Sequence, residues 1–185
     1  MSNEASPTKV VLKNVRFSYA SVFEPKTVGK GTDKKYSVSL LIPKTDKVSK
    51  AAIDAAIEHL VADAKSKNKN KLPSGFKLPL RDGDVDRDDD SNYEGHWFIN
   101  ASSKTKPGIV DRNKVEITDP SKFYSGCYGF ASVNFYLFDV DTNKGIACGL
   151  NNLMKTKDGD PLAGKASAEA DFADVEFEDE DEDLL

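Results

Sequence analysis

The sequence predicts a mainly β protein: a small, mostly antiparallel barrel of five or six strands with one helix inserted between its early and late strands. Three observations predict this. Stretches rich in β-branched and aromatic residues recur along the chain, several of them with the alternation of a strand that buries one face. Only one segment has the apolar spacing of a helix, so strands do not alternate with helices as in a parallel sheet. The length of 185 residues suits one domain.

The first part of the chain supplies two strands. Residues 1–8 form a flexible lead, and residues 9–19 have the Val, Phe and Tyr content of a strand. Proline and two glycines mark a turn within 24–33. Residues 35–42 then alternate between apolar and polar side chains, and Pro43 ends this second strand.

One clear helix follows at 46–67. Asp46 can cap its start, and Lys65 and Lys67 suit the negative end of the helix dipole. The long stretch 68–92 is irregular, basic in its first half and acidic in its second. The helix is predicted from apolar residues that recur at steps of three and four, namely Val48, Ala52, Ile53, Ala56, Ile57, Leu60 and Ala64.

Strands resume in the second half of the chain. Residues 95–103 and 109–110 read as strands, and 126–140 form a long β run rich in aromatic residues. A hairpin loop at 141–145 returns the chain into a strand at 145–151. The sequence therefore predicts an ordered domain over 9–165 and a disordered acidic tail over 166–185.

The net charge of −5 conceals a division between a basic body and an acidic tail. Residues 169–185 hold ten of the 31 carboxylates and no Lys or Arg, which leaves 21 carboxylates against 26 basic residues, or +5, in 1–168. A second acidic block at 82–96 has seven carboxylates and a single basic residue, Arg87. The remaining body is strongly cationic, which indicates a polyanionic partner.

Composition also bears on location. No apolar run approaches the roughly 20 residues that span a bilayer, and the start of the chain has no hydrophobic signal stretch. Cys127 and Cys148 are too few for a disulfide framework or a zinc site. We therefore expect an intracellular protein that is neither secreted nor bound to a membrane.

The residues indicate no enzyme. The only two histidines, His59 and His96, are interpreted as a helix residue and a strand residue, and no Gly-x-Ser-x-Gly motif, phosphate loop or dinucleotide fingerprint is present. The stretches 82–88 and 139–145 resemble the start of a calcium loop, but both lack its Gly at the sixth position and Glu at the twelfth. We expect no catalytic residues, no cofactor and no metal site.

Aromatic and basic residues are interleaved along the predicted strands. Aromatic rings stack on unpaired bases for about 1–3 kcal/mol each, and lysines attract phosphates, so this combination favours single-stranded nucleic acid. The candidate stacking residues are Tyr19, Trp97, Phe98, Tyr128, Phe130 and Tyr136. The candidate phosphate contacts are Lys13, Arg16, Lys34, Lys35, Lys104, Lys106, Arg112, Lys114 and Lys122.

The two faces of the β run can be separated by position. Over 128–138 the odd positions are small or apolar, as a barrel interior requires, whereas the even positions mix aromatic and polar residues, as a stacking surface requires. In 96–102 the same test leaves open whether the face with Trp97 or the face with Phe98 is buried.

The acidic tail resembles a strand of phosphates in its charge. Tethered near a cationic groove at about millimolar effective concentration, it competes with nucleic acid and is released for protein partners when nucleic acid binds. A plain solubilising tail is the alternative. The predicted partner-binding residues are Glu178, Asp179, Glu180, Asp181, Glu182, Asp183, Leu184 and Leu185.

Six blocks of the sequence form a recognisable combination, namely 19–26, 35–44, 98–102, 123–126, 132–135 and 145–152. Together they are similar to a family of phage single-stranded DNA-binding proteins, which is related to the helix-destabilising protein of the T-odd coliphages. The resemblance covers about 9–155 and the tail. It implies an OB-fold, non-catalytic binding of single-stranded DNA in phage replication, recombination and repair in the host cytoplasm, and a tail that contacts phage or host replication proteins. The coliphage relative ends in Phe, whereas this chain ends in Leu184-Leu185.

Two other functions remain open at this level. One is an acidic-tailed interaction module that acts as a DNA mimic, inhibitor or assembly chaperone, and the other is a metal-dependent nuclease using 82–90. The sequence leaves undecided the preference for DNA or RNA, the site size, the cooperativity and the oligomeric state.

Overall fold

A computed structural model describes residues 6–27, 32–140, 142–162 and 172–176. In this part of the chain seven strands form one sheet in the order β3-β4-β2-β1-β6-β7-β5. The strands are β1 (Lys9–Thr27), β2 (Lys34–Pro43), β3 (Arg81–Asp82), β4 (His96–Ser103), β5 (Gly108–Val110), β6 (Tyr128–Val140) and β7 (Asn143–Lys157). The helices are α1 (Lys47–Ser66), α2 (Gly83–Asp86) and the 3-10 turns η1 (Ser91–Tyr93) and η2 (Pro120–Lys122).

Five of these strands close into a barrel. β1, β2, β4, β7 and β6 are joined in that order, and β6 returns to β1. The β4–β7 pair is parallel and the other four pairs are antiparallel. β3 extends the sheet beside β4, and β5 extends it beside β7. This is the small closed barrel of an OB-fold with two added strands, which confirms the predicted fold class.

The barrel interior follows from alternation along the strands. In β6 the odd positions Gly129, Ala131, Val133 and Phe135 are buried, whereas the even positions from Tyr128 to Asn134 are half-buried. The sequence-based division of this strand is therefore confirmed, because every second side chain points into the closed barrel.

The burial along β4 shows which face of 96–102 points into the barrel, a question that the sequence left open. Ile99 and Ala101 are fully buried in the main core, and Trp97 packs against the same core. Phe98 lies on the opposite, outer face but is also fully buried, in a small separate cluster with Leu41 and Tyr93. Both faces of β4 are therefore covered near its start.

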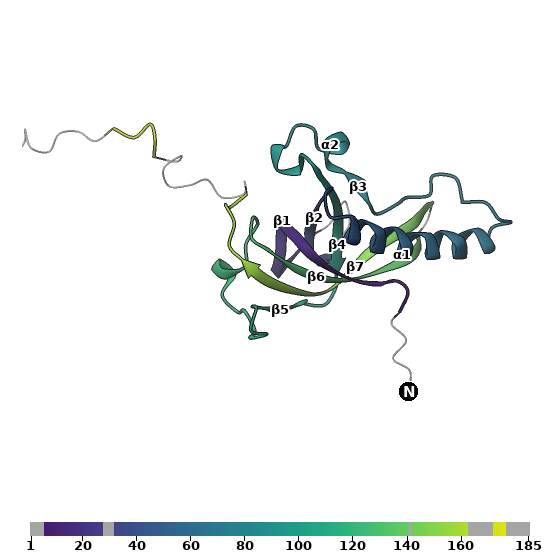
Figure 1. Ribbon diagram of the computed structural model, residues 1–185, viewed down its shortest axis with the longest axis horizontal. Coiled ribbons are helices and arrows are strands. Elements are labelled where there is room, and N and C mark those ends of the chain that lie inside the picture. The colour runs from purple at the N-terminus through teal and green to yellow at the C-terminus, as the bar shows by residue number, and fades with distance from the viewer. Residues whose placement is uncertain (1–5, 28–31, 141, 163–171, 177–185) are drawn as a thin grey trace, which may run out of the picture.

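Helix α1 packs against β1 and β6, with Ile53, Ala56 and Leu60 in the main core, and lies to the right of the barrel in Figure 1. Its N-cap, Asp46, accepts hydrogen bonds from the backbone N–H of Ser49 (3.0 Å) and from its hydroxyl (2.6 Å). The predicted helix at 46–67 agrees with the observed one to within a residue at each end. None of the described helices is long and apolar enough to cross a membrane.

The acidic segment Asp82–Glu94, most of which lies in the stretch predicted to be irregular, is packed against the barrel. It folds over the outer face of the barrel at the top of Figure 1 and buries Tyr93, whose ring meets Phe98 edge-on at 5.1 Å. The Tyr93 hydroxyl lies 3.3 Å from the hydroxyls of Ser18 on β1 and Ser39 on β2.

Two further contacts hold the start of this segment. Lys44 forms ion pairs with Asp82 (2.6 Å) and Asp84 (2.7 Å), and these hydrogen bonds raise the pKa of Lys44. Gly83 lies so close to the carbonyl oxygens of Tyr93 and His96 that any side chain there would overlap them. The segment is therefore a docked part of the fold.

Two strands are longer than their sequences indicated. β1 continues through the expected turn to Thr27, because Pro25 lies between Ser21 and Lys26, where the pairing with β2 is irregular. β7 runs on to Lys157, since its later residues pair with β6 and β5.

Candidate nucleic-acid interface

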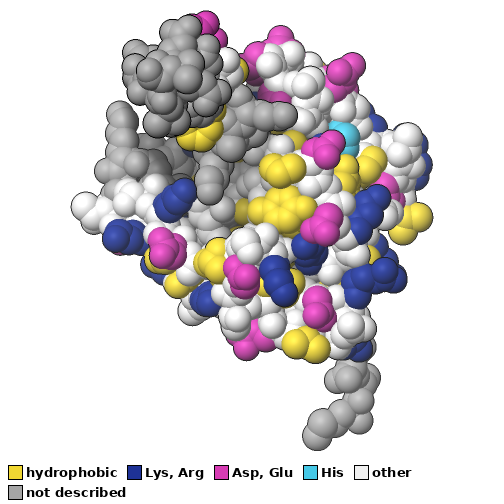
Figure 2. Space-filling view, turned by 90° about the vertical axis from the view of Figure 1, so that its left-hand side faces the viewer, with side chains coloured by type: hydrophobic (Ala, Val, Ile, Leu, Met, Phe, Trp, Pro, Cys, Tyr) yellow, Lys and Arg dark blue, Asp and Glu magenta, His cyan; other side chains and the backbone are white. Residues whose placement is uncertain are grey.

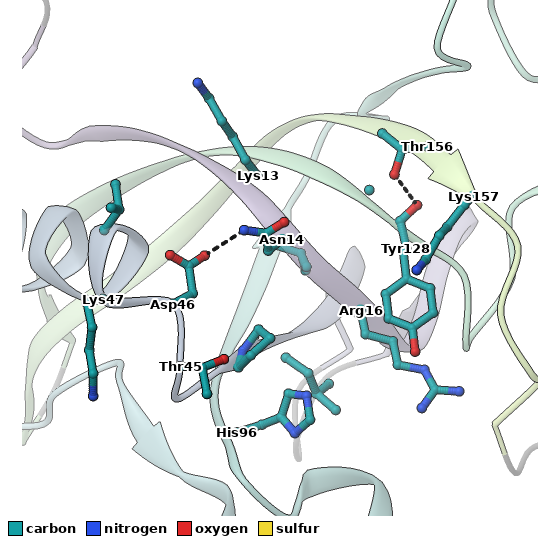
Figure 3. A pocket seen from close by; sticks show the side chains of 15 residues that line it. Lys13, Asn14, Arg16, Thr45, Asp46, Lys47, His96, Tyr128, Thr156 and Lys157 are labelled. Carbon is teal, nitrogen blue, oxygen red and sulfur yellow. Dashed lines mark hydrogen bonds between the residues drawn. The ribbon is translucent and has the colours of Figure 1, made fainter.

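A cationic groove of about 710 Å³ lies where the middle of β1 meets the ends of β6 and β7 and the start of α1. Its lining carries four cationic side chains and one carboxylate, Asp46. The four are Lys13 and Arg16 from β1, Lys47 from α1 and Lys157 from β7. We refer to it as the β1–β6 groove (Figure 3).

Tyr128 supplies the aromatic surface of the β1–β6 groove. Its half-buried ring has the Lys157 ammonium 4.6 Å and the Arg16 guanidinium 5.3 Å from its centroid. The strand pairing sets this arrangement, because Tyr128 is the register partner of Arg16 in β1 and of Lys157 in β7. Figure 3 shows both cations beside the ring. A ring between two cations suits a nucleotide, since the base stacks while the phosphate meets the charges.

Arg16 is held in place by the backbone. Its Nε donates to the carbonyl oxygen of Gly126 (3.2 Å), and its Nη2 donates to that of Asp160 (2.9 Å). Both acceptors are neutral backbone carbonyl groups, so these two hydrogen bonds bring no negative charge next to the guanidinium.

Asp46 stays charged at the edge of the β1–β6 groove. Hydrogen bonds from the hydroxyl and backbone N–H of Ser49 keep the pKa of this carboxyl below its usual value. It also accepts from the Asn14 side chain (3.1 Å), as the dashed line in Figure 3 shows. Against four cations, this one carboxylate leaves the lining with a net positive charge.

Four other predicted phosphate contacts gather around the start of β2 and the end of β4. Lys34 and Lys35 begin β2, where Lys35 pairs with Lys26 of β1. Tyr36, the next residue of β2, pairs with Ser103, which places Lys104 close by. Lys106 lies 5.6 Å from the ring of Phe23. None of these four lysines is in the lining of the β1–β6 groove, so they belong to a separate surface.

The remaining three predicted cations line neither of these surfaces. Arg112 and Lys114 are exposed in the turn after β5, where the Asp111 carboxylate accepts from the backbone N–H groups of Asn113 and Val115. Lys122 is exposed in η2.

The predicted stacking residues differ widely in exposure. Tyr19 and Tyr136 are the most open, at 56% and 41% exposed, and Phe130 is half-buried on the outer face of β6. Trp97 is half-buried, packs on the core and has the ammonium groups of Lys44 and Lys50 within 4.7 and 5.1 Å of its ring.

The prediction that Phe98 stacks on a base is wrong. It has no exposed surface, because the acidic segment places Tyr93 over its ring. An outward position on a strand is available to a base only where no other part of the chain covers it.

The candidates taken from the sequence omit Lys47 and Lys157, which line the β1–β6 groove, and Arg87, whose guanidinium lies over the ring of Tyr19. Lys157 was missed because the last strand was ended at 151, although apolar Leu153 and Met154 continue its pattern. Arg87 was overlooked as one cation among seven carboxylates. The predicted tail residues Glu178–Leu185 lie outside the described residues.

The chain after β7, residues 158–162, passes along the side of the barrel that carries Arg16 and Tyr19. Leu162 donates its backbone N–H to the carbonyl oxygen of Ser125 (2.9 Å), and the Tyr124 hydroxyl contacts Asp158 and Gly159 (3.0 Å each). Partial burial raises the pKa of Tyr124, which remains a neutral donor. Residues 158–162 thus run from Arg16 toward Tyr19, beside which Leu162 lies. Figure 2 shows this side of the molecule, with Lys and Arg side chains around a hydrophobic patch and acidic side chains between them.

An OB barrel with an aromatic ring between cations in a surface groove is typical of proteins that bind single-stranded nucleic acid through stacking and charge. Over residues 8–185 the chain matches the model of the family described as the ssDNA-binding protein of Enterobacter phage Enc34, and it belongs to that family. The resemblance to phage single-stranded DNA-binding proteins is therefore confirmed.

Individual relatives agree with this assignment. The chain is 32% identical over 182 residues to protein p50 of Acyrthosiphon pisum secondary endosymbiont phage 1, covering 94% of this chain and 97% of the relative. The solved structure of the single-stranded DNA-binding protein of bacteriophage Enc34 in complex with ssDNA has 28% identity and a TM-score of 0.70, covering 84% of this chain and 90% of that one. The single-stranded DNA-binding protein gp2.5 of bacteriophage T7, at 15% identity and a TM-score of 0.60, covers 86% of this chain and 97% of that one, and it shares the fold.

Proposed function

We propose that this protein binds single-stranded DNA without reading its sequence, as a non-catalytic protein that protects and organises DNA in phage replication, recombination and repair. The observation that carries the proposal is the β1–β6 groove, where Tyr128 lies between Arg16 and Lys157. Ring stacking and phosphate attraction are available to every nucleotide, so this pair of contacts is sequence-tolerant. The bound DNA of the Enc34 relative supports the choice of ligand.

In this proposal residues 9–165 form the OB-fold nucleic-acid-binding domain, and residues 166–185 form the acidic tail. The tail competes with DNA for the cationic surface and binds phage or host replication proteins when DNA releases it. Two observations support competition: the tail holds a row of carboxylates, and Leu162, shortly before the tail begins, lines the same pocket as Tyr19 and Arg87. The free thiols Cys127 and Cys148 suit the reducing host cytoplasm, where we place this activity.

Fluorescence titration with oligo-dT at several salt concentrations tests the proposal. We expect tight binding that weakens steeply as salt rises, because phosphate contacts release counterions. Tyr128→Leu keeps the position apolar and removes the ring, and it should weaken binding about tenfold without changing the salt dependence. Absence of oligonucleotide binding, together with capture of a cationic protein, would support the acidic interaction module instead.

A further inference from the structure

The docked acidic segment carries one arginine, Arg87, whose guanidinium lies over aromatic rings. Its Cζ atom is 5.6 Å from the ring centroid of Tyr19, 5.5 Å from that of Tyr93 and 6.0 Å from that of Phe98. Within the part of the chain that the structure describes, no ion pair involves Arg87, whereas Arg81 in the same region pairs with Asp86 at 3.2 Å. Arg87 therefore directs its guanidinium at three aromatic rings, although carboxylates surround it in the sequence.

Tyr19 presents its ring from an unusual backbone conformation. Its φ of 46° is in the left-handed region, which a bulky residue rarely adopts. The pairing of β1 with β2 is irregular between Ser18 and Ser21, and the N–H of Ala20 donates to the Ser125 hydroxyl (3.0 Å). This geometry leaves the Tyr19 side chain 56% exposed beside Arg87. Strained backbone that displays an aromatic ring is typical of binding sites.

A pocket of about 300 Å³ lies between these two side chains and the acidic segment. Its walls include the carboxylates of Asp89 and Asp90, which repel a phosphate. The ring of Tyr19 and the planar guanidinium of Arg87 attract a flat π system. The chemistry of the pocket therefore fits an unpaired base, with its phosphate kept outside.

The position of the pocket also allows a nucleic-acid strand bound in the β1–β6 groove to reach it. Residues 158–162 connect the two sites, because Asp160 accepts from Arg16 in the groove and Leu162 lines the pocket. Ser18 pairs with Ser39 of β2, and Tyr19 follows it at the point where this pairing becomes irregular, next to the strands with which OB-folds bind oligonucleotides.

We propose that Tyr19 and Arg87 form a subsite that stacks one unpaired base of the bound strand, and that the acidic segment exists in part to supply this arginine. The subsite rests on the proposed function, since it takes a nucleotide of the same single strand. Its ligand class is the base itself, which distinguishes Arg87 from the phosphate-binding lysines of the groove.

Oligonucleotide titrations of Arg87→Gln and Arg81→Gln test the subsite. Both changes remove one positive charge from the same region, but Arg81, just before the acidic segment, is paired with Asp86 and lies outside the pocket. We expect Arg87→Gln to weaken oligo-dT binding about tenfold, with the salt dependence unchanged, and Arg81→Gln to have little effect. Arg87→Lys keeps the charge and loses the planar face, so it should behave like Arg87→Gln.

Tyr19 provides an independent arm. Tyr19→Asn removes the ring and substitutes a residue that tolerates positive φ, so it should weaken binding to a similar extent, whereas Tyr19→Trp should preserve it. On an oligonucleotide whose sugars carry no bases, wild type and Arg87→Gln should bind equally. Thermal unfolding of each variant checks that the fold is retained.

The outcomes separate the possibilities. If the wild type binds oligo-dT and the Arg87→Gln variant binds it as tightly as the Arg81→Gln variant does, the subsite alone is overturned. A slope of log K against log salt that falls by about 0.7 in Arg87→Gln would make Arg87 a phosphate contact and overturn the base assignment. Failure of the wild type to bind any oligonucleotide would overturn the proposed function and the subsite with it.

Discussion

The β1–β6 groove makes a quantitative prediction about salt dependence. We consider the triple change Lys13→Gln, Lys47→Gln and Lys157→Gln, which neutralises three of its four cations. Arg16 is left in place because it also donates to the carbonyl oxygens of Gly126 and Asp160, so its removal would disturb the fold as well as the charge.

The magnitude follows from counterion release. Each phosphate contact to a single strand contributes about 0.7 to the slope of log K against log salt, so losing three contacts lowers the slope by about 2. If this is the whole effect, binding weakens roughly 100-fold at 0.1 M salt but only about fourfold at 0.5 M, and the affinities converge near 1 M.

Oligo-dT titrations at four or five salt concentrations measure this slope. The matched control is Lys65→Gln, Lys69→Gln and Lys71→Gln, which makes the same change in net charge at the far end of α1, on exposed side chains outside the groove. The control should leave the slope close to that of the wild type. If both triples lowered the slope equally, binding would depend on net charge and the groove assignment would be refuted.

Three further predictions concern the tail and the packing of the barrel. Deleting 169–185 should tighten oligonucleotide binding at low salt, since it removes ten competing carboxylates, and weaker binding of the truncated protein in the same titration would contradict competition. Phe98→Ala should cost about 3–5 kcal/mol in the free energy of urea unfolding, because it empties a fully buried site beneath Tyr93, and a loss below about 1 kcal/mol would argue against that burial. Asp46→Ala should lower stability by about 1 kcal/mol at pH 7 through loss of the helix cap. The pKa of Asp46 is lower in the folded protein than its unfolded value of 3.8. The charged carboxylate therefore contributes to stability above pH 3.8, and this contribution is lost as the pH falls through the folded pKa. The unfolding free energies of wild type and variant should thus converge only in strong acid.

Much of the fold was predictable because its signals are local. The alternation in 128–138 assigned the buried face of β6 correctly, and the three- and four-residue spacing located α1. Both patterns arise from the geometry of a single element against one core, so they need no knowledge of the remainder of the chain.

The candidate site was predictable only in part. Lys13, Arg16 and Tyr128 were identified from residue type, and the structure brings them together in one groove. Lys157 joins them through the antiparallel register of β6 and β7, and Lys47 joins them through the packing of α1 beside β1. Leu153 and Met154 could have extended the last strand to Lys157, but neither the strand register nor the packing of α1 can be derived from residues nearby in the sequence.

The burial of Phe98 and the position of Arg87 could not be predicted from the sequence alone. The sequence determined that this is a β-rich barrel with a cationic body, many aromatic residues and an acidic end, because composition and periodicity fix which surfaces must be buried and what charge the others carry. Only the tertiary structure decided which outward rings are open, because that depends on the distant segment Asp82–Glu94 folding back over β1, β2 and β4, where it covers Phe98 and brings Arg87 over Tyr19. Contacts between residues far apart in the chain are chosen by the packing of the whole molecule, so no local pattern records them.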